Sequence, residues 1–274
     1  MLEPTIATKQ IIEQIFDDAA TLYDRIGPSI FAQFGAHLVD LLPLAPGVRV
    51  LDIATGTGAV LLPMAHRVGP EGRAIGIDLS SVILQEAEHA VRANGLTNVE
   101  LRKMDAEHLE FPDQSFDVVT CAFSLFMFPD MEAALHEMYR VCKPGGYLAI
   151  ANFNKIPPPF DPGWTILMKQ FMAYRIGVRP PQPMTYTPQE MEALLRRFGF
   201  GSIEIHNETY DLVYASAEDW WAFLLSLLTR ATIMSMDEEM RARFKDEYFA
   251  KLRPMFQPDG LHISLAVIYA LAKR

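Results

Sequence analysis

The 274-residue chain lacks most features that mark secreted, membrane-spanning or nucleic-acid-binding proteins. Its only cysteines, Cys121 and Cys142, are isolated, which argues against a disulfide framework or a cysteine metal site. No uninterrupted apolar run could span a bilayer, and the first residues lack the basic start and apolar block of a signal peptide. The net charge of −10 argues against a nucleic-acid partner. These absences predict a cytoplasmic protein whose length suits one large α/β domain, or a core with a cap.

What the chain does contain is a strand, a glycine turn and a helix close to residue 50. The apolar and β-branched residues 50–53 are typical of a buried parallel strand, and a helical apolar run begins at Ala59. Gly56 and Gly58 stand between them, where side chains would hold a ligand away from the backbone N–H groups at the helix start. Such a turn binds a nucleotide-like ligand, and the candidates are a dinucleotide and S-adenosylmethionine.

The turn lacks the third glycine of the dinucleotide fingerprint, because Leu61 stands in its place. Instead an acid, Asp52, precedes the turn, and a carboxylate at a strand end can attract an ammonium group. The series Asp52, Ala54, Gly56 and Gly58 resembles motif I of class I S-adenosylmethionine-dependent methyltransferases. Ala54 replaces the usual first glycine and is small enough to leave the turn open.

Three further segments resemble the ubiquinone/menaquinone C-methyltransferase group of that family. They are Phe-Asp-x-x-Ala-x-x-Tyr-Asp at 16–24, Phe-Pro-Asp-x-Ser-Phe-Asp-Val-Val at 111–119 and Arg-Val-Cys-Lys-Pro-Gly-Gly at 140–146. With motif I, these blocks cover about residues 10–153. The resemblance implies S-adenosylmethionine as cofactor and an α/β, Rossmann-like sheet of seven strands in the order 3-2-1-4-5-7-6, the last strand antiparallel.

The strand ends carry the predicted cofactor contacts. Asp78 ends the second strand and can accept both ribose hydroxyls, although an acid at the start of the helix 81–94 would look the same. After the third strand, the resemblance places Asp105 and Ala106 beside the adenine ring; the alternative for Asp105 is a solvated turn. The full predicted cofactor set is Tyr23, Asp52, Ala54, Thr55, Gly56, Gly58, Asp78, Leu79, Asp105, Ala106 and Phe123.

The remaining segments are expected to cover the carboxyl ends of the strands, where ligands bind in parallel α/β sheets. Long helices are predicted over 5–25, 28–42, 130–142 and 188–198, and strands six and seven over 202–210 and 261–272. The predicted division of the chain is an N-terminal helical lid (1–45), a cofactor-binding core (46–153), a connector with a cap helix (154–187), two pieces completing the sheet (188–210 and 261–274) and a helical cap (211–260).

The covering segments are apolar and aromatic, which favours a small hydrophobic or aromatic methyl acceptor. The residues predicted to line its pocket are Phe16, Phe126, Trp164, Trp220 and Trp221, although packing of the cap onto the core would equally explain them. Methyl transfer to carbon, oxygen or nitrogen would proceed by in-line displacement with water excluded.

A general base is needed only if the acceptor has to lose a proton, and the candidates are His262, His206 and Tyr186. A lone histidine is nevertheless more often structural. No metal site is predicted, because Asp105 and Asp130 lack partners at metal-ligand spacing.

Two other functions stay open at this point. One is a protein of the same fold that binds S-adenosylmethionine without methyl transfer, or that serves another reaction; the other is a nicotinamide-dependent dehydrogenase. The sequence also leaves the oligomeric state open, a homodimer included.

Overall fold

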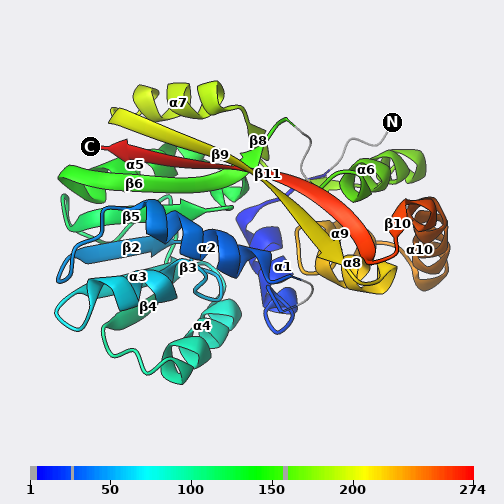
Figure 1. The fold of residues 1–274 in the computed structure, drawn as a ribbon, viewed down its shortest axis with the longest axis horizontal. Coiled ribbons are helices and arrows are strands. Elements are labelled where there is room, and N and C mark those ends of the chain that lie inside the picture. Colours follow the sequence, from blue (N-terminus) through cyan, green and yellow to red (C-terminus); the bar gives the residue numbers. More distant parts are fainter. Residues whose placement is uncertain (1–4, 26–27, 157–159) are drawn as a thin grey trace.

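The computed structural model describes residues 5–25, 28–156 and 160–274 around a mostly parallel β-sheet (Figure 1). Its long strands lie in the order β4, β3, β2, β5, β6, β11, β9, and β11 is antiparallel to both of its neighbours. The predicted order and the antiparallel last strand are thereby confirmed. In that order, the strands span Val99–Lys103, Arg73–Asp78, Arg49–Ile53, Phe116–Ala122, Cys142–Asn154, Gly260–Lys273 and Gly201–Tyr214.

The prediction of seven strands was too low, because the sheet has nine. Two two-residue strands complete it: β8 (Thr185–Tyr186) pairs with β6, and β10 (Phe256–Gln257) pairs with β11. A separate pair joins β1 (Thr5–Ile6) to β7 (Val178–Arg179). Strands this short carry no hydrophobic periodicity, so a sequence pattern does not reveal them.

The sheet is apolar because helices cover both of its faces. Along β2, Val50 packs in one core cluster with residues of α2 and α3, whereas the next residue, Leu51, packs in a second cluster with residues of α5 and α7. Val118 and Val119 of β5 divide between the same two clusters. This alternation is the side-chain period of a strand buried on both faces.

The helices of the core begin at recognisable caps. Thr8, Ser80, Asp130 and Thr187 each accept a hydrogen bond from a backbone N–H in the first turn of α1, α4, α5 and α7. The predicted helix over 5–25 is shorter, because β1 precedes α1 and turns follow it. The core helices are α1 (Lys9–Ala19), α2 (Ile30–Leu41), α3 (Leu61–Val68), α4 (Ser81–Ala93), α5 (Met131–Val141) and α7 (Pro188–Arg197), with a 3₁₀ turn η1 (Leu125–Met127).

Four helices form a cap beside one end of the sheet (Figure 1). β9 and β11 continue past the sheet into this cap, where they pair from Leu261 with Tyr214 onward. β9 therefore ends four residues later than predicted. The cap elements are α6 (Gly163–Tyr174), α8 (Ala217–Leu224), α9 (Thr229–Met234), α10 (Glu238–Leu252) and the 3₁₀ turn η2 (Arg253–Met255). The proline run 157–159 of the predicted connector lies outside the described residues.

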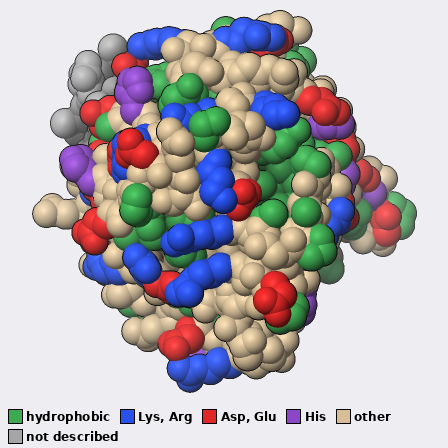
Figure 2. All heavy atoms as spheres, turned by 90° about the vertical axis from the view of Figure 1, so that its left-hand side faces the viewer, with side chains coloured by type: hydrophobic (Ala, Val, Ile, Leu, Met, Phe, Trp, Pro, Cys, Tyr) green, Lys and Arg blue, Asp and Glu red, His purple; other side chains and the backbone are tan. Residues whose placement is uncertain are grey.

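At the opposite end of the molecule, basic and acidic side chains are interspersed rather than gathered by sign (Figure 2). Among the described residues, no helix has the length and apolar character needed to cross a membrane.

The cap has an aromatic core of its own. The Trp220 indole N–H donates to the Tyr248 hydroxyl over 2.6 Å, and that hydroxyl donates to the Gly163 carbonyl over 2.9 Å. These two bonds join α8, α10 and α6. A Cβ on Gly163 would lie 2.8 Å from the Trp220 ring, so the close approach requires glycine. Trp220 and Trp221 are both buried in this core.

Tyr248→Phe should therefore lower the free energy of unfolding by about 2–4 kcal/mol, because it leaves the buried Trp220 N–H and Gly163 carbonyl without partners. Tyr147→Phe, at a half-buried tyrosine of β6, is the control and should stay within about 0.5 kcal/mol of wild type. Urea unfolding at neutral pH measures both. Equal stabilities of the two variants would contradict the role given to this hydroxyl.

Candidate functional site

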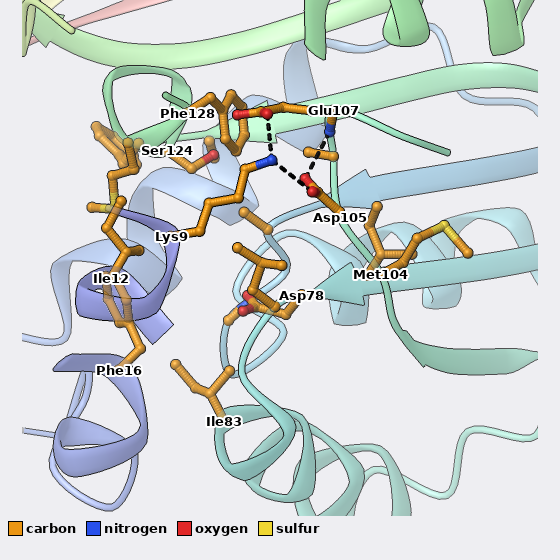
Figure 3. A pocket seen from close by; sticks show the side chains of 18 of the residues that line it. Lys9, Ile12, Phe16, Asp78, Ile83, Met104, Asp105, Glu107, Ser124 and Phe128 are labelled. Carbon is orange, nitrogen blue, oxygen red and sulfur yellow. Dashed lines mark hydrogen bonds and ion pairs between the residues drawn. The ribbon is translucent and has the colours of Figure 1, made fainter. Parts of the chain in front are cut away.

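A pocket lies at the carboxyl ends of β2, β3, β4 and β5, and we call it the strand-end pocket (Figure 3). α1 and the turn after it supply its other side, through Lys9, Ile12, Phe16 and Tyr23. With α1 in this position the cavity is about 70 Å³. From the strand ends, the pocket is lined by Ala54, Gly56, Ile77, Asp78, Leu79, Ile83, Met104, Asp105, Ala106, Glu107, Ala122, Phe123, Ser124, Met127, Phe128 and Pro129.

The turn after β2 has the left-handed backbone that its small residues allow. Ala54 and Gly56 have φ values of +53° and +56°. For Ala54 this conformation costs about 1–2 kcal/mol, since alanine carries the Cβ that glycine lacks. The Thr55 N–H holds the turn against β3 by donating to the Ile77 carbonyl over 2.8 Å. Strain kept at a ligand-lining turn is typical of functional sites.

Asp52 lies behind this turn instead of in the pocket. Its carboxylate is almost fully buried and accepts hydrogen bonds from the hydroxyls of Thr55 at 2.7 Å and Thr120 at 2.6 Å. Burial raises the pKa of Asp52 to about 6, although both hydroxyls work against the shift. Asp52, Thr55 and Gly58, which the sequence placed in the cofactor set, do not line the pocket. The geometry gives Asp52 a supporting position, in which it ties the turn to the central strand β5.

Asp78 meets both descriptions that the sequence left open, because it borders the pocket and also lies at the start of a helix. One carboxylate oxygen accepts from the Gly56 N–H at 3.0 Å and the other from the Ser80 N–H at 3.0 Å, beside the start of α4. The same carboxylate lines the pocket (Figure 3). Burial is the main reason that its pKa is raised. Each oxygen keeps a lone pair, so the group can accept a vicinal diol.

The far end of the pocket contains an ion-pair cluster that sequence reasoning missed. The Lys9 ammonium lies 2.7 Å from Asp105 and also contacts Glu107 (Figure 3). Burial lowers the Lys9 pKa, but hydrogen bonds to both carboxylates outweigh it and leave the pKa raised. Asp105, Glu107 and His108 also bring potential metal-ligand atoms within 4.8 Å of one another, which the sequence spacing did not suggest. Lys9 already pairs with both of these acids.

A second cavity of about 340 Å³ adjoins the first, and we call it the aromatic pocket. Its lining residues come from α1, the turn after it, α2, the segment after β5, the end of β6, α6, the 176–184 connector and residues 227–229 at the start of α9. No Asp, Glu, His, Lys or Arg is among the described residues that line it. Its aromatic residues are Phe16, Tyr23, Phe31, Phe123, Phe126, Phe153, Phe160, Trp164 and Phe171.

The two pockets share one wall, because Phe16, Tyr23, Phe123 and Met127 line both. Tyr23 stacks on Phe31 with ring centroids 5.3 Å apart and meets Phe16 edge-on at 5.7 Å. Phe123, directly after β5, has a φ of +53°, a strained conformation for a bulky residue. These shared residues border both cavities where they adjoin and present aromatic faces to each.

The structure divides the remaining predicted site residues. Leu79, Asp105 and Ala106 line the strand-end pocket, and Phe16, Phe126 and Trp164 line the aromatic pocket. Trp220 and Trp221 do not line either pocket, since the cap core buries them.

The three proposed bases lie elsewhere. His262 sits between Asp211 at 2.6 Å and Asp259 at 3.0 Å, because β11 continues into the cap beyond the sheet. His206 pairs with Glu204 at 3.0 Å on β9, and the Tyr186 hydroxyl contacts Met131. None of them lines either pocket.

A parallel α/β sheet with a glycine turn after β2 and an acid at the end of β3 has the architecture of class I S-adenosylmethionine-dependent methyltransferases. The model of the ubiE/COQ5 methyltransferase family matches residues 5–180. Aklanonic acid methyltransferase DauC of Streptomyces sp. (strain C5) is 36% identical over 197 residues, which cover 69% of this chain and 84% of that protein. The demethylmenaquinone methyltransferase of Listeria welshimeri is 35% identical over 180 residues, covering 64% and 74%.

The fold is also that of a solved S-adenosylmethionine-dependent methyltransferase from Aquifex aeolicus, with a TM-score of 0.53 at 24% identity over 72% of this chain and 92% of that one. The chain belongs to the ubiE/COQ5 methyltransferase family. It is an S-adenosylmethionine-dependent methyltransferase.

The strand-end pocket fits this cofactor. Asp78 offers a carboxylate for a ribose diol, and Gly56, whose φ of +56° favours glycine, places no side chain in the pocket. Asp105 and the apolar Met104 and Ala106 suit an adenine ring, whose amino group donates and whose faces are apolar. The aromatic faces of the shared wall suit a sulfonium charge.

Asp78→Asn should weaken binding of S-adenosylhomocysteine roughly 10- to 100-fold, because hydrogen bonds to a charged acceptor contribute about 1.5–3 kcal/mol. Calorimetric titration measures the dissociation constant, and Asp40→Asn, at an exposed acid paired with Arg67, is the control. Unchanged affinity in Asp78→Asn would remove Asp78 from the cofactor site.

Asp52 should make stability depend on pH. Its pKa is raised on folding from 3.8 to about 6, so the native state favours the protonated form, and the stability present below pH 4 is lost as pH rises through 6. Relative to Asp52→Asn, the wild type should lose up to about 3 kcal/mol between pH 4 and pH 7. Thr120→Val, which removes one hydroxyl donor, should steepen this loss. Urea unfolding over pH 4–7 tests it, and parallel curves would contradict it.

Proposed function

We propose that this enzyme methylates a hydrophobic, aromatic small molecule that carries no charge other than that of its own nucleophile and is held in the aromatic pocket. The observation that carries the proposal is the wall shared by the two pockets, which places an apolar, ligand-sized cavity directly against the strand-end pocket. The family alone does not select the acceptor, because the two relatives are named for different ones. The lining of the aromatic pocket is what favours this class of compound.

S-adenosylmethionine, when bound, supplies an electrophilic methyl group on a sulfonium. The protein's part is to bind the two partners in adjoining cavities that meet at the shared residues, so that the nucleophile can face the methyl group, and to exclude water with α1, α6 and the cap. Positioning of this kind can contribute on the order of 7–11 kcal/mol. A dry, aromatic surrounding also favours the loss of charge when an anionic nucleophile meets a cation.

The acceptor is expected to bring its own ionised or electron-rich nucleophile. Of the described residues lining the aromatic pocket, Tyr23 and Thr229 are the two with side-chain hydroxyls. Burial, with the charges of Asp24 and Asp78, raises the Tyr23 pKa above its ordinary value. Tyr23 therefore stays protonated and can donate a hydrogen bond, but it does not act as a base at neutral pH. His262, His206 and Tyr186 have no part in this proposal.

An acceptor screen with methyl-labelled cofactor tests the acceptor class. Hydroxylated polycyclic aromatics should be methylated, whereas the same rings carrying an added ammonium or carboxylate group should not, because the described lining offers no opposite charge. The rate should rise with pH through the acceptor's own pKa rather than that of an enzyme group. Preference for the charged analogues would overturn the proposal.

Trp164→Ala should raise the KM for such an acceptor roughly ten-fold or more, because it removes apolar surface from the pocket wall. Its affinity for S-adenosylhomocysteine should not change. Trp221→Phe, in the cap core, is the control and should leave the acceptor KM near that of wild type. Steady-state kinetics at saturating cofactor measures both variants, and an unchanged KM in Trp164→Ala would place the acceptor elsewhere.

A further inference from the structure

α1 closes one side of the strand-end pocket, and its first residue, Lys9, extends across that pocket. The Lys9 side chain extends from α1 to the acids that follow β4, with Asp78 on the side of the strand ends (Figure 3). Ile12 and Phe16 of the same helix also line the pocket. A cofactor in this pocket would therefore contact α1, and we expect α1 to move when the cofactor enters or leaves.

The two acids that Lys9 contacts are not equivalent. The Glu107 side chain is 5% exposed, and its other oxygen accepts from the Asp130 N–H at 2.9 Å. Among the described residues Lys9 is the cation that forms an ion pair with this buried carboxylate, and loss of such a partner is strongly unfavourable. The Asp105 side chain is 30% exposed and borders the pocket, so it can take a new partner. Glu107 is thus the permanent anchor for Lys9, whereas Asp105 is free to be shared.

Other contacts also hold α1 against the sheet, but they lie outside the pocket. Lys103 of β4 donates to Glu13 at 2.6 Å, and the Ser80 hydroxyl donates to Asp17. None of these four residues lines the strand-end pocket. Lys9 is therefore the one ion-pairing residue of α1, among those described, that both holds the helix and borders the cofactor.

We propose that Lys9 is a cofactor-retaining residue, whose ion pair with Glu107 closes α1 over the bound cofactor while Asp105 is shared with the adenine ring. α1 then opens by breaking this pair, which limits the rate at which S-adenosylhomocysteine leaves. The proposal rests on the cofactor and is independent of the acceptor class. Because an ion pair is screened by salt, release from the wild type should quicken with ionic strength more than release from a variant without the pair.

Stopped-flow displacement of S-adenosylhomocysteine by excess competitor tests the proposal. Lys9→Met keeps the apolar stem and should release the ligand roughly 10- to 100-fold faster. Glu107→Gln should behave likewise, and the double variant should be no faster than the single ones. Lys103→Met removes a surface ion pair of α1 outside the pocket and should change release less than two-fold.

Hydrogen exchange of the α1 amides gives a second readout. S-adenosylhomocysteine should protect residues 9–19 in the wild type and in Lys103→Met, but much less in Lys9→Met. Unchanged release in Lys9→Met would overturn the proposal. Slower release would overturn it as well, because it would mean that Lys9 weakens cofactor binding instead of retaining the cofactor. Equal acceleration in Lys9→Met and Lys103→Met would overturn it too, because the effect would then be general loosening of α1.

Discussion

The buried carboxylate of Asp52 is the contact on which the site depends. Its bonds to Thr55 and Thr120 join the turn after β2 to the neighbouring strand β5. The same turn carries Ala54 and Gly56 in left-handed conformations, and β5 leads directly to Phe123, which is strained in the same way. One desolvated acid therefore fixes two strained turns relative to each other, and those turns border the place where the two pockets meet.

The features that the sequence predicted come from motifs of adjacent residues. The sheet order and the cofactor were implied by the resemblance of residues 50–58 and three further blocks to a known family, and each of these motifs is contiguous in the sequence. The sequence did not predict the ion pairs of Lys9, because Lys9 and Asp105 are 96 positions apart and each side chain alone is typical of a solvated surface charge. The prediction for His262 assumed that strand seven begins at the edge of the sheet; β11 instead begins inside the cap.

The aromatic residues have two separate tasks that composition does not distinguish. Trp220 has its indole N–H bonded to Tyr248 inside the cap core, whereas Trp164 lies on α6 at the aromatic pocket. Which task an aromatic side chain serves is decided by the helix face and by its partner across the cap, and neither is fixed by local pattern. The sequence pattern therefore indicated an aromatic cover, but it could not tell that Trp164 borders the aromatic pocket whereas Trp220 and Trp221 lie in the cap core.

The continuous pairing of β9 with β11 bears on how such an enzyme diversifies. The two strands pair along their whole length, β11 also pairs with β6, and helices α8 to α10 lie between β9 and β11 in the chain. Chain between paired strands tolerates insertion, deletion and exchange. Replacement of residues 215–259 during evolution would therefore change the cap and the ligands that it admits. The residues of the strand-end pocket lie earlier in the chain and would stay the same.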